Sequence, residues 1–380
     1  MSQQVDQQEN SERPRVWLLL GEKRGDNAQI VNLADALGWG HEVKRIVVKA
    51  KWILGKPWVR PTLHHLDLEE SDRFEAPWPD LVITAGRRLS CAALWIKRAS
   101  AGKTRLVMIG TPRRLLDSID LIVVARHYEL EPRHNVARHD LPFMHADPRA
   151  LEDAKTLWKS RLAESPRPLT ALMVGGPTGG LRFDLEAARD LFGKTLESVK
   201  ASGGSLYITT SRRTPAVIVE MIRRACPESA RLFEFDSEAT PSQNPYHALL
   251  GEADRFIVTA DSVSMMVEVA RLARSLAIYP FECETGLFER GLEAAGIVRP
   301  LDPRRDPIPA GGLWARTMYR LGRPVHKRDL SAIPRLLVDK GRASWLGEEW
   351  VAASSFVDDE LEAVADRIRM LVVERTRAGV

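Results

Sequence analysis

The chain has 380 residues, more than a single hydrophobic core normally serves, so two domains are expected. Hydrophobic residues make up 44% of it and the formal net charge is +4, which is typical of a globular protein and not of a dedicated nucleic-acid binder. The widely spaced Cys91, Cys226 and Cys283 favour a reducing compartment over a disulfide framework or a zinc site.

No apolar run is long enough to cross a membrane, and residues 1–14 are polar and Gln-rich. We expect these first residues to be disordered, without a signal peptide, and the protein to be cytoplasmic.

Two series of short β-rich segments alternate with helical patterns, which is typical of parallel sheets. The first series predicts a domain over residues 15–147, with strands at 16–20, 43–48, 81–84, 106–109 and 121–124 and helices at 26–37 and 89–100. A second domain is expected over 165–341, with strands at 169–174, 205–209, 231–235, 255–258 and 275–279 and helices at 184–201, 215–225, 246–251 and 262–273. A helix over 148–163 lies between them.

Residues 342–380 are expected to form a C-terminal helical segment. Its apolar face over 358–377 suits packing back on the first domain. The fold class is therefore α/β, with two Rossmann-like domains facing across a cleft.

A glycine-containing stretch, residues 21–29, follows the first strand and carries Asp26 where a helix is expected to begin. Glycines there allow a ligand to approach the backbone, and a helix start presents free N–H groups. Asp26 is either a helix N-cap or a group that faces a ligand.

Two further stretches open helices after strands in the second half. Residues 175–180 read Gly-Gly-Pro-Thr-Gly-Gly, which suits close passage of a phosphate or sugar at Gly175, Gly176, Thr178 and Gly179. Residues 209–215 place Ser211 and Arg212 beside a helix N-terminus, where an anion is favoured. A plain loop and a solvated charged loop are the alternatives.

The fourth stretch combines Asn244 and Tyr246 with Ser262, Ser264 and Glu268. The two serines, with nearby N–H groups, can hold phosphate, and the carboxylate can accept hydrogen bonds from both ribose hydroxyls. The alternative makes Ser262 or Asp261 a helix cap and Glu268 a surface residue, although its apolar neighbours argue against an idle surface position.

The segment 49–60 interleaves basic residues with Trp, Ile and Leu. Contact of Lys51, Trp52 and Trp58 with an anionic membrane surface is one interpretation, and tryptophans in a packed loop are the other.

Together, residues 25–29, 175–180, 209–215, 244–246 and 259–265 resemble the Elm family, which is named for a plant mitochondrial-fission factor. Its bacterial members are regarded as candidate glycosyltransferases of the GT-B superfamily. The fourth stretch also looks like the donor site of the GT-B enzyme that makes lipid II. In that enzyme the first glycine-rich loop ends in histidine, whereas Asp26 stands there in this chain.

The resemblance implies a metal-independent glycosyltransferase with a nucleotide-diphosphate sugar as co-substrate and no other cofactor. The loops of the second domain would bind this donor, and Asp26 would be the catalytic base. The acceptor would be a hydroxyl, with a membrane lipid or a lipopolysaccharide core as candidates, placing the protein on the inner face of a bacterial membrane. Nucleic acid is not an expected partner. A sugar-nucleotide epimerase of the same fold and a non-catalytic recruitment scaffold stay as alternatives.

Overall fold

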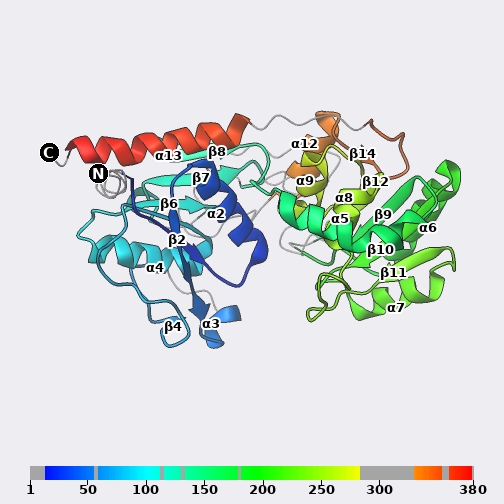
Figure 1. The fold of residues 1–380 in the computed structure, drawn as a ribbon, viewed down its shortest axis with the longest axis horizontal. Helices are drawn as coiled ribbons and strands as arrows, with labels where there is room; N and C mark the ends of the chain where they lie inside the picture. Colours follow the sequence, from blue (N-terminus) through cyan, green and yellow to red (C-terminus); the bar gives the residue numbers. More distant parts are fainter. Residues whose placement is uncertain are drawn as a thin grey trace, which may run out of the picture. The chain divides into compact units, whose positions relative to one another are not determined.

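The computed structural model describes residues 13–54, 59–111, 115–128, 130, 133–178, 181–282, 329–352 and 359–378. The chain divides into two compact units, coloured along the sequence in Figure 1. Within the described ranges, unit 1 contains residues 13–144 and 359–378, and unit 2 contains residues 145–282 and 329–352.

Unit 1 is built on a six-stranded sheet in the order β2-β1-β5-β6-β7-β8, and all of its neighbouring strands are parallel. The strands are β1 (Val16–Leu20), β2 (His41–Arg45), β5 (Leu81–Ala85), β6 (Arg105–Ile109), β7 (Leu121–Ala125) and β8 (Val136–His139). Its helices are α2 (Arg24–Ala36), α3 (Lys51–Leu54), α4 (Gly86–Ala99) and α13 (Asp359–Ala378), with a 3-10 turn η1 (Leu116–Ser118). A small antiparallel pair, β3 (Val47–Val48) and β4 (Leu66–Asp67), lies outside the sheet.

Both faces of this sheet are buried at β1, which explains the continuous apolar run of that strand. Trp17 and Leu19 belong to a core cluster that includes α4, whereas Val16 and Leu18 belong to a second cluster that includes α2 and α13. Strands covered by helices on both faces need apolar residues at every position.

The C-terminal helix α13 packs on α2 and β6 of unit 1. Ile368 and Val372 are buried on it, and the guanidinium of Arg367 donates to the carbonyl of Val136 at 2.9 Å. Helix α13 therefore completes the core of unit 1, which also contains the first strand, β1.

Unit 2 contains a second six-stranded parallel sheet, in the order β11-β10-β9-β12-β13-β14. Its strands are β9 (Leu169–Val174), β10 (Ser205–Thr210), β11 (Ala230–Phe233), β12 (Arg255–Thr259), β13 (Ser275–Tyr279) and β14 (Ser344–Trp345). Its helices are α5 (Pro148–Ala163), α6 (Leu185–Ser202), α7 (Ala216–Ala225), α8 (Tyr246–Glu252), α9 (Val263–Arg271) and α12 (Ala332–Asp339). This strand order is that of the dinucleotide-binding Rossmann fold.

The α/β fold class with Rossmann-like sheets is thus confirmed by the strand order and direction. Two details differ from the sequence-based expectation. The strand expected at 43–48 is broken at Ile46, whose buried side chain joins the core while Val47 and Val48 pair with β4. Residues 344–345 pair with β13, so this part of the expected C-terminal segment 342–380 belongs to unit 2.

Each sheet reverses its strand order at one point, between β1 and β5 in unit 1 and between β9 and β12 in unit 2. Loops at the carboxyl ends of such neighbouring strands diverge to opposite faces and leave room for a ligand. The candidate site is therefore sought in the loops that follow these four strands.

Candidate functional site at the carboxyl ends of the strands

The glycine-rich loop follows β9 at the reversal point of unit 2. The N–H of Gly175 donates to Thr259 Oγ1 at 2.8 Å, and the N–H of Gly176 donates to Asp261 Oδ2 at 3.0 Å. Both acceptors follow or end β12, the neighbouring strand. These two N–H groups are therefore satisfied within the protein, and the part of the loop left to meet a ligand begins after them.

The absence of side chains at these two glycines allows this close approach. A Cβ at Gly175 would stand 2.3 Å from both carboxylate oxygens of Asp261 and 2.4 Å from Ser262 Oγ. A Cβ at Gly176 would stand 2.0 Å from the carbonyl oxygen of Arg213. Tight packing between loops, and not only access for a ligand, explains why glycine occupies both positions.

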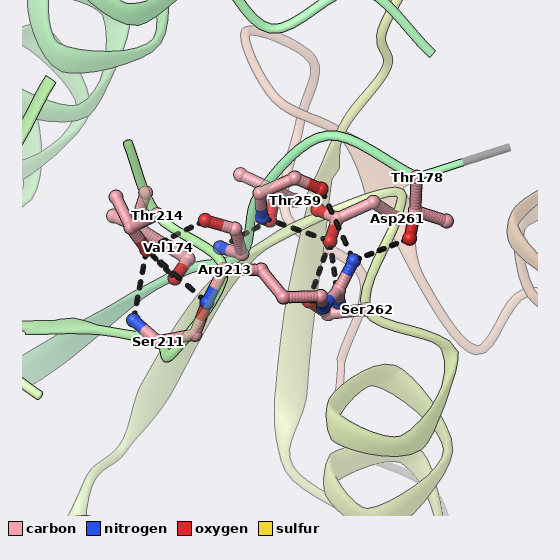
Figure 2. A network of polar contacts seen from close by, with 10 residues as sticks. Val174, Thr178, Ser211, Arg213, Thr214, Thr259, Asp261 and Ser262 are labelled. Atoms are coloured by element: carbon pink, nitrogen blue, oxygen red, sulfur yellow. Dashed lines mark hydrogen bonds and ion pairs between the residues drawn. The ribbon is translucent and has the colours of Figure 1, made fainter. Parts of the chain in front are cut away.

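Arg213 bridges three loops, as Figure 2 shows. Its Nη1 donates to the carbonyl of Gly176 at 3.1 Å and to Thr178 Oγ1 at 2.6 Å, while its Nη2 lies 2.7 Å from Asp261 Oδ2. The Ser262 hydroxyl also donates to Asp261 Oδ2, at 3.1 Å. Arginine suits this role because its planar fork carries several donors in fixed directions.

The loop after β10 is tied to the same network by Thr214. Its hydroxyl donates to the carbonyl of Gly175 at 2.6 Å, and its Oγ1 accepts from the N–H of Ser211 at 2.9 Å. Ser211 is half-buried in this turn, with its Oγ 3.1 Å from Thr214 Oγ1. Ser211 thus lies beside the glycine-rich loop, through Thr214.

Sequence reasoning chose Arg212 and passed over its neighbour. Arg212 is exposed, and no carboxylate pairs with it among the described residues. Arg213 and Asp261 form the centre of the network, and Asp261 was considered only as a helix cap. In the sequence, the available signal is that Arg213 follows β10 and Asp261 follows β12. Only the tertiary structure shows that these two strands are the neighbours of β9.

Ser262 and Ser264 lie at the start of α9. Ser262 occupies the N-cap position, but its hydroxyl points to Asp261 and forms no cap bond to the helix. Ser264 is half-buried in the first turn. The first N–H groups of a helix have no intrahelical partner and favour a negative charge.

Glu268 and Tyr246 form a pair between α9 and α8. The Tyr246 hydroxyl donates to Glu268 Oε2 at 2.7 Å, and Asn244 Oδ1 accepts from the N–H of Tyr246 at 3.0 Å. Burial raises the pKa of Glu268, against the lowering effect of the Tyr246 bond. Burial and the neighbouring Glu268 raise the pKa of Tyr246 well above its usual range. Glu268 is half-buried, so the surface position considered as its alternative is wrong.

Two further residues, Thr178 and Gly179, were expected at the donor loop. Thr178 is half-buried and accepts from Arg213, as described above. Gly179 lies outside the described residues.

Asp26 lies at the reversal point of unit 1. It belongs to the first turn of α2, whose N-cap is Lys23, so Asp26 is not the cap. Its Oδ2 lies 3.7 Å from Lys23 Nζ and 3.6 Å from where a Cβ on Gly86 would stand, at the start of α4. The preceding turn is closed by Asn27, whose side chain bonds both the N–H and the carbonyl of Gly21, at 3.1 and 2.7 Å.

The residues expected at a membrane have mixed environments. Lys51 is exposed, whereas Trp52 is half-buried against the core of unit 1 and contacts the ring of His64 edge-on at 5.2 Å. Trp58 lies outside the described residues. In the part of the chain that the structure covers, no helix combines the length and apolar character needed to cross a bilayer.

Acidic, histidine and cysteine side chains do not gather into a metal-binding group of three or more anywhere in the described ranges.

Comparisons with known proteins give a matching family and two sequence relatives. The family described as Mitochondrial fission ELM1 matches residues 24–319. Mitochondrial fission protein ELM1 of Arabidopsis thaliana is 27% identical over 251 residues, covering 60% of this chain and 58% of that protein. The chain thus spans less than two thirds of this relative's length. The uncharacterized protein RP120 of Rickettsia prowazekii (strain Madrid E) is 23% identical over 297 residues, covering 70% of this chain and 82% of that protein.

Solved structures resemble this chain more remotely. UDP-GlcNAc 2-epimerase from Neisseria meningitidis, bound to UDP-GlcNAc, matches with a TM-score of 0.48 and 11% identity over 95% of this chain and 100% of that one. UGT89C1 of Arabidopsis thaliana, complexed with UDP-L-rhamnose, matches with a TM-score of 0.39 and 14% identity over 70% and 79%. Likenesses at this level carry no argument about function.

Proposed function

The chain belongs to the mitochondrial fission ELM1 family, and from that premise we propose that it is a glycosyltransferase whose unit 2 binds a nucleotide-diphosphate sugar. The sugar would pass to a hydroxyl acceptor. The observation that carries the proposal is the meeting of three loops at the reversal point of the Rossmann-type sheet, joined by Arg213 and opening onto the first turn of α9.

The diphosphate is the part of the donor that this edge suits best. The first turn of α9 offers N–H groups and the side chain of Ser264, and Arg212 is an exposed guanidinium without a carboxylate partner in the described ranges. Arg213 is already committed to Gly176, Thr178 and Asp261. We therefore assign Arg212 to the diphosphate and Arg213 to holding the loops.

We assign the nucleoside to the pair formed by Glu268 of α9 and Tyr246 of α8. Glu268 Oε2 accepts from Tyr246, and Oε1 has no hydrogen-bond partner among the described residues. A half-buried carboxylate with a free oxygen is suited to accept from ribose hydroxyls. Burial already raises the pKa of Glu268, so a pair of hydroxyl donors would compensate part of the cost of its charge.

In this proposal Asp26 takes the proton of the acceptor hydroxyl as a general base. Asp26 lies at the reversal point of unit 1, and 29% of its side chain is exposed, which leaves it accessible to an acceptor. The acceptor is proposed to be a membrane lipid or a lipopolysaccharide core, with Lys51 as a peripheral membrane contact. Neither a metal nor a further cofactor has a part in the proposed reaction.

The test is isothermal titration with a panel of nucleotides and nucleotide-diphosphate sugars. We expect Arg212→Gln to weaken diphosphate binding by about 1.5–3 kcal/mol, the scale of a charge-assisted hydrogen bond, while leaving nucleoside affinity unchanged. Arg189→Gln, which removes an exposed arginine on α6, is the matched control. If the wild-type protein binds no nucleotide, the proposal that it is a glycosyltransferase is rejected and a recruitment scaffold is favoured. Hydrolysis or other turnover of the nucleotide-sugar without any acceptor would instead indicate a hydrolase or an epimerase.

A further inference from the structure

The loops at the proposed donor site enclose one negative charge, that of Asp261. Its side chain has no exposed surface, and its Oδ2 lies 2.7 Å from Nη2 of Arg213 (Figure 2). The same oxygen accepts from the N–H of Gly176 at 3.0 Å and from the hydroxyl of Ser262 at 3.1 Å. Its Oδ1 has no hydrogen-bond partner within the described ranges. The carboxylate is therefore enclosed by the protein, with three donors on one oxygen.

Asp261 lies beside both elements of the proposed diphosphate site. Each of its carboxylate oxygens would stand 2.3 Å from a Cβ on Gly175, so the carboxylate packs directly against the glycine-rich loop. Val263, two residues further along the chain, is the first residue of α9. The first turn of α9 is where we place the diphosphate. A diphosphate bound there would lie close to the negative charge of Asp261.

The charge of Asp261 is balanced by Arg213. Bonds from Nη1 of Arg213 to the carbonyl of Gly176 and to Thr178 Oγ1 hold this guanidinium beside the loop. The pair as a whole carries no net charge. Without Asp261, Arg213 would present a full positive charge to an anion at this edge of the sheet, and the anion would bind more tightly. The buried carboxylate therefore limits the affinity of the loops for a diphosphate.

Transfer of a sugar changes the charge of the bound nucleotide. A nucleotide-diphosphate sugar carries about two negative charges, because each phosphate keeps a single ionisable oxygen. When the sugar leaves, the terminal phosphate gains a second ionisation with a pKa of about 6, so the product approaches three negative charges at neutral pH. Coulomb energy is proportional to charge. A fixed carboxylate therefore opposes the product more strongly than the donor.

We propose that Asp261 promotes release of the nucleoside-diphosphate product by opposing its charge, while Arg213 limits the repulsion so that the donor still binds. This inference rests on the proposed function, because it takes the first turn of α9 to hold the diphosphate. It gives Asp261 an effect on affinity in addition to its part in joining the loops. A residue that only joined the loops would have the opposite signature, since its loss would weaken the binding of donor and product alike.

The experiment titrates charge variants calorimetrically with UDP, ADP and GDP and with UDP-glucose, ADP-glucose and GDP-glucose. Asp261→Asn removes the negative charge and keeps an acceptor for the N–H of Gly176. Arg213→Gln removes the positive charge, and the double variant removes both. Asp254→Asn is the matched control, because it removes a carboxylate that precedes β12, at the opposite end of the strand, and pairs with Arg167 at 3.0 Å.

We expect Asp261→Asn to bind the nucleoside diphosphate roughly tenfold more tightly than the wild type, and its glucose ester only about fivefold more tightly. Arg213→Gln should bind both more weakly, with the larger loss for the diphosphate. The double variant should bind the diphosphate more tightly than Arg213→Gln, because the unbalanced carboxylate is gone. Asp254→Asn should match the wild type. The ratio of two affinities measured on one variant does not depend on the folded fraction, so a loss of stability leaves the comparison valid.

Several outcomes would overturn the inference. Weaker binding of both ligands by Asp261→Asn would leave this residue as a joint between loops. Equal tightening of both ligands would remove the preference against the product. Equal affinities of Arg213→Gln and the double variant, or the same tightening in Asp254→Asn, would also contradict it.

The wild-type titrations separate this inference from the proposed function. If the wild-type protein binds a nucleotide and its glucose ester but the variants do not follow the expected order, the donor site stands and the role of Asp261 is rejected. If the wild-type protein binds none of these ligands, the donor site is rejected and this inference with it.

Discussion

Arg213 and Asp261 form an ion pair with 2.7 Å between Nη2 and Oδ2, in which the Asp261 side chain is completely buried and the Arg213 side chain is 38% exposed. The pair joins the loop after β10 to the loop after β12, and Asp261 also accepts from the N–H of Gly176. The carboxylate thus depends on neighbours from two other loops.

Replacing Asp261 tests how much this pair contributes. Asp261→Asn keeps an acceptor for Gly176 but removes the charge opposite Arg213, and we expect a loss of about 1–3 kcal/mol in the free energy of unfolding. Urea denaturation measures it. Glu186→Gln removes a carboxylate paired with Arg182 that is 85% exposed, and should change stability by less than about 0.5 kcal/mol. Equal effects of the two changes would mean that the buried pair is no stronger than a surface one.

The glycine-rich loop should tolerate no side chain at its start. Gly175→Ala places a Cβ 2.3 Å from the Asp261 carboxylate and should destabilise unit 2 by several kcal/mol, on the order of other overpacked sites. Gly193→Ala is the matched control, because nothing lies within 4 Å of its Cβ position in α6. That change should stabilise the protein by about 0.5–1 kcal/mol. Thermal melting of both variants gives the comparison, and a stable Gly175→Ala protein would contradict the packing argument.

Glu268 should make stability depend on pH. Because burial raises its pKa in the folded state, that state holds the proton more tightly than the unfolded chain does. Its contribution to stability is therefore most favourable below the unfolded pKa and is lost as the pH rises through the raised folded pKa.

Glu268→Gln removes the charge and should raise the melting temperature at neutral pH relative to the wild type, with a smaller difference in acid. The same variant should bind nucleotide-diphosphate sugars more weakly, by about 1–3 kcal/mol, because an amide is a poorer acceptor for ribose hydroxyls. A constant difference in melting temperature between the variant and the wild type at every pH would show that burying the charged Glu268 carboxylate does not lower stability.

The Asp26→Asn variant tests the catalytic role of Asp26 separately from its contribution to stability. Since Lys23 is the N-cap of α2, Asp26→Asn removes only a 3.7 Å ion pair with an exposed lysine, and the melting temperature should hardly change. If Asp26 is the general base, transfer should fall by about 10²–10⁴-fold at unchanged donor affinity. Turnover at the wild-type rate would show that Asp26 is not the base.

Replacing Trp52 and replacing Lys51 should affect different properties of the protein, its stability and its membrane binding. Trp52→Ala should destabilise unit 1 by about 1–3 kcal/mol, because the ring packs on the core and on His64. Lys51→Gln should leave stability unchanged and reduce cosedimentation with anionic vesicles. Undiminished cosedimentation of the Lys51 variant would remove this residue from any membrane contact.

Much of the fold follows from local pattern. The strands β1, β9 and β13 have the bounds expected from their apolar runs, and α5 begins and ends where expected, since Asp147 caps it and Pro148 is its first residue. The weaker elements could not be found in this way. β8 and β14 are short, and β14 is a strand only because β13 provides a parallel neighbour.

The candidate site shows the same division. Residue types and their place after strands pointed to the glycine-rich loop, Ser211, Ser262 and Glu268 from the sequence alone, because loops after parallel strands meet at one edge of a sheet. Their role in binding a donor stays a prediction. Which of two adjacent arginines is committed to the protein was decided only by tertiary structure. Arg213 meets Asp261 because β9 lies between β10 and β12 in the sheet, an order that no local pattern encodes. The burial of Asp261, and with it the need for glycine at position 175, follows from that order of strands.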